Sequence, residues 1–158
     1  MTAPTRALLD RTGIEGLIPH RPPFLFLDRV VERDDLELVA EWRVPETADW
    51  FRGHYPGNPV TPGVILCEHV MQAAAVLLAV RGVSFAPEDG TPVLARIEKA
   101  KFKRMVRPGE VLTTRAALKE QVAEAYFMEG KAAVGGEPAL ELRFTLTRTA
   151  ATRAQPAS

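Results

Sequence analysis

The pattern of apolar and polar residues divides the chain into several strands and one long helix. Residues 36–44 and 139–148 alternate between apolar and polar side chains, as a strand does when only one of its faces is buried. Turn residues such as those of RPGE and GGEP separate the segments on either side of them. The remaining predicted strands are 24–31, 93–104, 111–119 and 124–134.

Residues 64–81 have the composition of a helix. They contain many good helix formers and neither proline nor glycine before Gly82, so they predict a helix of about five turns. The segment is apolar on almost all sides, which is typical of a helix buried within a domain. A shorter helix is predicted at residues 5–12.

The order of these elements is a strand pair, one buried helix, and a run of antiparallel strands. A single hydrophobic helix has to be covered, and a sheet wrapped around it is the simplest α+β arrangement. We therefore predict one domain over residues 1–148. The small and polar residues 149–158 predict a disordered tail.

Charge and cysteine content narrow the possible functions. The chain has 20 basic and 20 acidic residues, without the basic excess that nucleic-acid binding demands. Its single cysteine, Cys67, excludes an internal disulfide and fits a reducing compartment. The N-terminus lacks the apolar core of a signal peptide, and the long helix contains Glu68 and His69. We therefore expect a cytoplasmic protein without membrane insertion.

Residues 54–62 predict a rigid loop that leads into the long helix. Prolines at 56, 59 and 62 fix their own φ angles and restrict the residues before them, which excludes a helix here. His54 begins this loop and is a base that titrates near neutral pH. At the start of the helix, the backbone N–H groups of Gly63 and Val64 are free to polarise a carbonyl oxygen and stabilise an enolate.

Glu68 lies one turn into the helix, at a position where burial is expected. Burial raises the pKa of a carboxyl group, and a raised pKa suits a general acid near neutral pH. Each residue by itself also has a structural interpretation, His54 as a hydrogen-bonded histidine and Glu68 as a partnered residue in a dimer interface. Together, a base, backbone donors and an acid suit proton abstraction next to a carbonyl, coupled to protonation of a departing hydroxyl.

Three blocks of sequence resemble one known family, the bacterial 3-hydroxyacyl-[acyl-carrier-protein] dehydratases. GHYPGNPVTPGV (53–64), followed by Glu68 and Gln72, is similar to the family's signature loop and acidic helix. IPHRPPFLFLDRV (18–30) and ARIEKAKFKRMVRPGE (95–110) resemble its two other motifs in the same order. The resemblance covers about residues 14 to 148, and a glutamate at 68 resembles the branch that only dehydrates.

The resemblance implies a hot-dog fold and a homodimer with shared active sites, often assembled as a trimer of dimers. It implies that His54 removes the C2 proton, that Glu68 of the other subunit helps the C3 hydroxyl leave, and that the Gly63 amide holds the thioester carbonyl. Further substrate-binding residues would be Val64, Tyr55 and Gln72. The resemblance implies no metal or redox cofactor. It implies that the substrate of this fatty acid biosynthesis step is carried on the phosphopantetheine of acyl carrier protein.

Lysines at alternate positions of the predicted strand 93–104 form a basic face with the following arginine. A solvated strand edge is the simpler interpretation. The resemblance favours docking of an acidic carrier protein by Lys99, Lys101, Lys103 and Arg104. His20, in the PHR segment, is expected to be a structural hydrogen-bonding residue.

Two other functions remain open from the sequence. In a hot-dog thioesterase, Glu68 would activate water against the thioester carbonyl, although hydrolysis has less need of a base aimed at C2. In a non-catalytic acyl-binding subunit, the pair of His54 and Glu68 would have no chemical role. Tyr55, Thr61 and His69 depart from the family pattern, so the acyl chain length is not predicted.

Overall fold

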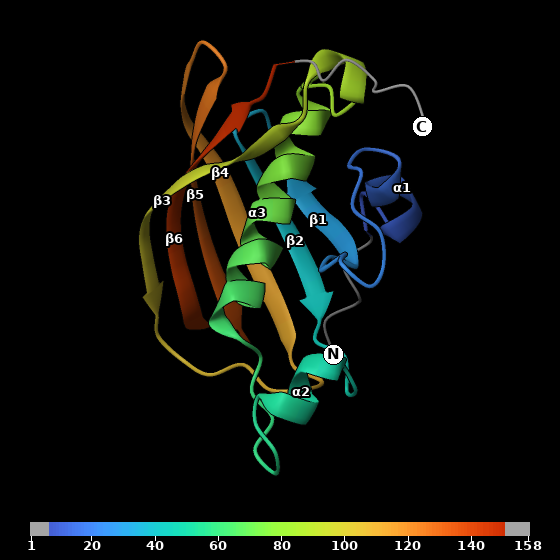
Figure 1. The fold of residues 1–158 in the computed structure, drawn as a ribbon, viewed down its shortest axis with the longest axis vertical. Helices are drawn as coiled ribbons and strands as arrows, with labels where there is room; N and C mark the ends of the chain where they lie inside the picture. Colours follow the sequence, from blue (N-terminus) through green and yellow to red (C-terminus); the bar gives the residue numbers. More distant parts are fainter. Residues whose placement is uncertain (1–6, 151–158) are drawn as a thin grey trace, which may run out of the picture.

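A computed structural model describes residues 7–150. Within this range, a six-stranded antiparallel sheet with the order β1-β2-β4-β5-β6-β3 curves around one long helix, α3 (Figure 1). This arrangement confirms the predicted α+β class. The elements are α1 (Arg11–Glu15), β1 (Arg29–Arg33), β2 (Glu37–Arg43), α2 (Asp49–Gly53), α3 (Gly63–Val80), a 3-10 turn (Pro87–Asp89), β3 (Pro92–Phe102), β4 (Val111–Val122), β5 (Ala125–Val134) and β6 (Glu137–Arg148).

The core lies between α3 and the concave face of the sheet. In β2, Leu38, Ala40 and Trp42 are buried as the alternation predicts, but Val39, predicted on the opposite face, is buried too. The helix approaches β5 so closely that a Cβ atom on Gly130 would lie 2.1 Å from a methyl group of Val70. Only glycine fits at this point of the sheet, so the packing distance of α3 depends on it.

The composition of α3 follows from this burial. By length and mean hydropathy (1.9), this helix passes the test for a membrane-spanning segment, against the expectation from its polar residues. However, 61% of that segment is buried inside the fold. A core helix wrapped by a sheet is apolar on most sides because most of its residues pack against other side chains.

The N-terminal part differs most from the prediction. The first strand, β1, begins at Arg29 and not at Phe24, because residues 24–28 run over α3 and are held there by side chains of that helix. The first helix is α1 and begins after Asp10, whose carboxylate accepts from the amide of Gly13. Part of the predicted helix 5–12, and the tail from 151 onward, lie outside the described residues.

Two short elements were not predicted, α2 and the 3-10 turn before β3. Five residues are too few to show a helical period, so α2 leaves no pattern in the sequence. Its position matters, because α2 leads directly into the proline-rich loop and ends where His54 begins (Figure 1).

Candidate active site

His54 is half-buried and caps the C-terminal end of α2. Its Nδ1 lies 2.8 Å from the backbone oxygen of Val60. A carbonyl oxygen only accepts hydrogen bonds, so Nδ1 carries the proton in the neutral ring and Nε2 keeps its lone pair. This tautomer is the one that a base using Nε2 requires.

The loop from His54 to Thr61 is fixed by its own backbone. Its amides and carbonyls pair between Tyr55 and Asn58, at 2.9 and 3.2 Å, and the amide of Val60 donates to the oxygen of His54 at 3.0 Å. The Tyr55 ring stacks on the imidazole with 4.1 Å between ring centroids. As predicted, these residues form neither helix nor strand. They form a closed loop, called the His54 loop below, that holds the imidazole in place.

The start of α3 has the predicted free amides. Ile65 and Leu66 are the first residues that donate to the carbonyl of Pro62, so the N–H groups of Gly63 and Val64 precede every intrahelical acceptor. A Cβ atom at Gly63 would lie 2.8 Å from the ring of Phe102 at the end of β3. Phe102, which the sequence did not single out, therefore lies beside these amides, and its ring occupies the space that a Cβ atom at residue 63 would take.

Glu68 lies in the second turn of α3, with its side chain 20% exposed. Burial raises the pKa of its carboxyl group, and a hydrogen bond from Gln72 opposes that effect. The amide Nε2 of Gln72 donates to Glu68 Oε1 at 3.0 Å. A carboxyl group with a raised pKa and one fixed oxygen has the properties that the sequence predicted for a general acid.

Gln72 is buried and makes two further hydrogen bonds to the segment before β1. Its Nε2 donates to the oxygen of Phe24 at 3.2 Å, and its Oε1 accepts from the amide of Phe26 at 2.7 Å. All of these contacts are with protein groups. Gln72, predicted as a substrate-binding residue, therefore holds Glu68 and the segment 24–26 together.

His69 is fully buried and joins three elements. Its Nδ1 lies 2.7 Å from the oxygen of Phe26, and its Nε2 lies 2.6 Å from the hydroxyl of Thr114 on β4. The ring stacks against Trp42. Because the carbonyl accepts from Nδ1, the Thr114 hydroxyl donates to Nε2, and the ring is held neutral. Burial lowers the pKa of His69 to about 4.

Acidification is expected to destabilise the protein through His69. The unfolded chain takes up a proton as pH falls through 6.5, whereas the folded ring resists it until about 4, so stability is lost across this window. The expected loss from this residue is about 2 kcal/mol between pH 7.5 and pH 5. Urea unfolding at both pH values measures it, with the His69→Gln variant as the comparison. An equal pH dependence in that variant would contradict the assignment.

His20 lies beside the carboxyl group of Glu68, which the sequence did not predict. Its Nε2 is 3.6 Å from Glu68 Oε1, and burial, followed by the charge of Arg21, lowers its pKa. His20 and Glu68 line one side of a cavity of about 300 Å³. The other walls are largely apolar and include Met71, Ala75, Phe85, Val93, Leu94 and Leu146. The PHR motif was the only sequence signal for this residue.

His54 does not line the Glu68 cavity. Tyr55, which follows His54, lines a different hollow of about 730 Å³ beside α2, together with residues such as Phe51 and Arg52. In the single chain, His54 and Glu68 therefore do not line one common cavity.

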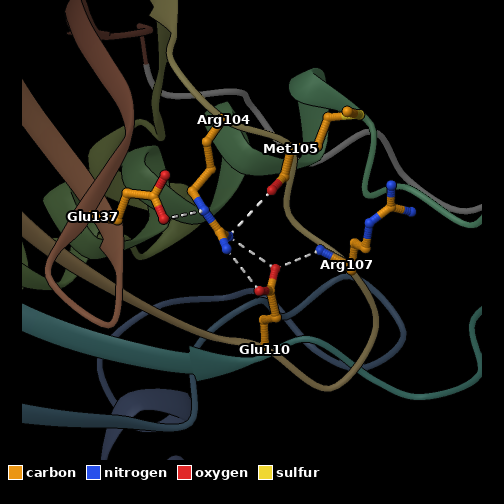
Figure 2. A network of polar contacts seen from close by, with 5 residues as sticks. All are labelled: Arg104, Met105, Arg107, Glu110 and Glu137. Carbon is orange, nitrogen blue, oxygen red and sulfur yellow. Dashed lines mark hydrogen bonds and ion pairs between the residues drawn. The ribbon is translucent and has the colours of Figure 1, made fainter.

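The predicted docking residues differ in how many ion pairs they already form with carboxylates of the same chain. Lys99 and Lys103 both reach the carboxylate of Glu141 on β6, at 3.7 and 2.5 Å. Arg104 is held by two glutamates, as Figure 2 shows: Glu110 accepts from both of its terminal nitrogens, and Glu137 accepts from Nε. These contacts give Arg104 a structural role within the chain.

The sequence is similar to known dehydratases along most of its length. A family model described as ApeI dehydratase matches residues 30–136. A 3-hydroxyacyl-[acyl-carrier-protein] dehydratase FabZ of Anaeromyxobacter sp. (strain K) is 39% identical over 147 residues, which cover 90% of this chain and 92% of the relative. The enzyme of that name from Oenococcus oeni is 41% identical over 135 residues, covering 83% and 93%.

Solved structures with the same fold have more distant sequences. The dehydratase heterocomplex ApeI:P from Xenorhabdus doucetiae aligns with a TM-score of 0.69 at 18% identity, covering 86% of this chain and 90% of that one. A hypothetical thioesterase from Streptococcus pneumoniae TIGR4 with coenzyme A aligns with a TM-score of 0.59 at 13% identity, covering 79% and 88%. These similarities confirm the predicted hot-dog fold.

Proposed function

The chain belongs to the 3-hydroxyacyl-[acyl-carrier-protein] dehydratases, and we propose that His54 and Glu68 are its catalytic base and acid. The protein is accordingly a hydro-lyase of fatty acid biosynthesis that converts a 3-hydroxyacyl thioester into the trans-2-enoyl thioester. The observation that carries the roles is the hydrogen bond from His54 Nδ1 to Val60, since it leaves Nε2 free to accept a proton.

The proposed reaction moves two protons and breaks one C–O bond. His54 Nε2 takes the C2 proton, while the N–H groups of Gly63 and Val64 stabilise the negative charge that develops on the thioester oxygen. The electron pair of the C2–H bond forms the C2–C3 double bond as the C3–O bond breaks. Glu68 gives its proton to the departing hydroxyl, which leaves as water. These steps need no metal or redox cofactor.

The second copy of the chain is proposed to complete each site. The edge strand β3 supports this, because its eleven residues are exposed except at Pro92 and bear large apolar side chains. Leu94, Ile97 and Phe102 are 43%, 42% and 51% exposed. Exposed apolar side chains on a sheet edge are typical of a surface that another chain covers. In the proposed homodimer, His54 of one subunit faces Glu68 of the other, and three dimers are proposed to associate.

The substrate is proposed to arrive on acyl carrier protein in the cytoplasm. Lys99 and Lys101 lie on β3 and Lys103 directly follows it, so all three are near Phe102, whose ring lies beside the start of α3. Their positive charges suit an acidic carrier whose phosphopantetheine arm enters at the Gly63 amides. Arg104 is already bound by two carboxylates, and Lys99 and Lys103 share Glu141, so the docking proposal depends mainly on Lys101 and on the exposed parts of the other two lysines.

One assay distinguishes dehydration from the alternatives. The protein is incubated with a 3-hydroxyacyl carrier-protein thioester, and the enoyl product and free thiol are measured together. Enoyl product without free thiol is expected. Free thiol without enoyl product would indicate a thioesterase, and tight binding without either product would indicate an acyl-binding subunit. A series of chain lengths in the same assay tests how Tyr55, Thr61 and His69 affect the acyl site.

A further inference from the structure

The segment 104–110, which connects β3 to β4, braces the His54 loop from outside. Arg107 Nη1 donates to Oδ1 of Asn58 at 2.9 Å and to the oxygen of Pro59 at 3.2 Å. The amide of Thr61 donates to the oxygen of Val106 at 2.8 Å. Residues 106 and 107 therefore follow the loop over 58–61, on both sides of the Val60 carbonyl that accepts from His54.

The segment 104–110 is itself held in place by a buried side chain, Val106, and by an ion pair between Glu110 and Arg104. Val106 is fully buried. The carboxylate of Glu110 accepts from the backbone amide of Arg107 at 2.8 Å and from both terminal nitrogens of Arg104 at 2.9 and 3.0 Å. Figure 2 shows the Arg107 guanidinium pointing away from this pair. Glu110 thus fixes the backbone at Arg107 while the Arg107 side chain remains available for the loop.

Arg104 connects the same segment to the first residue of β6, Glu137. Its Nε donates to Glu137 at 3.1 Å, and one terminal nitrogen donates to the oxygen of Met105 at 3.2 Å. At the other end, the amide of Gly109 donates to the oxygen of Val44 after β2. The connection is therefore tied to the sheet at both ends, so a displacement of Arg107 is resisted by several contacts.

We propose that Arg107, supported by the Glu110–Arg104 ion pair, is a positioning residue for His54. By holding Asn58 and Pro59, it keeps the Val60 carbonyl where it accepts from Nδ1, and so keeps Nε2 aimed and unprotonated. Arg107 acts through the loop and has no contact with substrate in this role. The proposal rests on the role of His54 proposed above.

The test compares Arg107→Met with Arg33→Met, a change of the same kind at an exposed position of β1. Arg107→Met is expected to lower kcat by about ten- to a hundredfold, with KM within about twofold, because a misplaced base slows chemistry more than binding. Arg107→Lys, which keeps one donor on the loop, is expected to recover part of the loss. Nitrogen-15 spectra of His54 are expected to change from one tautomer to a mixture in Arg107→Met only.

A second variant, Asn58→Ala, tests whether the loss of activity comes from the contact between Arg107 and the His54 loop and not from a general folding defect. Asn58→Ala removes one acceptor of Arg107, and the double variant is expected to be no slower than Arg107→Met alone, because both remove the same contact. A kcat within about twofold of wild type together with an unchanged His54 spectrum would overturn the positioning role. So would losses that simply multiply in the double variant. An active His54→Asn enzyme would instead overturn the role of His54 itself.

Discussion

Replacing His54 with asparagine is expected to lower enoyl formation by about 10²- to 10⁴-fold, the contribution typical of a general base. Asparagine can still donate a hydrogen bond to the Val60 carbonyl but cannot take the C2 proton, so the loop is kept while the base is lost. Turnover of a 3-hydroxyacyl thioester measures the loss. Thermal unfolding and molecular mass in solution establish that fold and assembly are unchanged.

Glu68→Gln provides the matching change on the acid side. Glutamine keeps the size of the side chain but has no proton to give to the departing hydroxyl, so a loss of similar size is expected. Glu32→Gln, at an exposed carboxylate on β1, is the control and should retain wild-type activity. Near-normal turnover in either His54→Asn or Glu68→Gln would show that the proposed roles are wrong.

Mixing two inactive variants is expected to restore activity. If the sites are shared, a dimer that pairs His54→Ala with Glu68→Ala has one site with both residues intact and one with neither. Random exchange of equal amounts makes about half of all dimers mixed, and each mixed dimer has one intact site of two. About a quarter of wild-type turnover should therefore return. The measurement is enoyl formation after denaturant-assisted subunit exchange, compared with each variant exchanged alone.

The exchange itself must be measured independently. Subunits of two masses allow mixed dimers to be counted by native mass spectrometry. Mixed dimers without recovered turnover would place each acid–base pair within one chain. That result would leave the dehydratase activity intact and would refute the shared site alone. Within the single chain, the cavity lined by Glu68 does not include His54.

The order of elements and the main motifs could be predicted because their signals are local. Alternation in residues 36–44 reports which side of a strand is buried, and β2 has the expected buried face. The run without proline or glycine between Gly63 and Gly82 predicts the extent of α3, which the structure places at Gly63–Val80. The limit of this approach is seen at residues 24–28, whose apolar run predicted strand although side chains of α3 bind both backbone groups of Phe26.

The sequence by itself therefore determined the fold class, the family, and the two residues on which the catalytic proposal depends. Only the tertiary structure decided how these residues are held. Gln72 reaches Phe26 across 46 positions, His69 reaches Thr114 across 45, and Arg107 reaches Asn58 across 49. Periodicity and propensity report the backbone within a few residues, whereas such contacts form only when the curvature of the sheet brings distant segments together. The same reason explains why His20 was set aside, since its place beside Glu68 depends on how the N-terminal segment crosses α3.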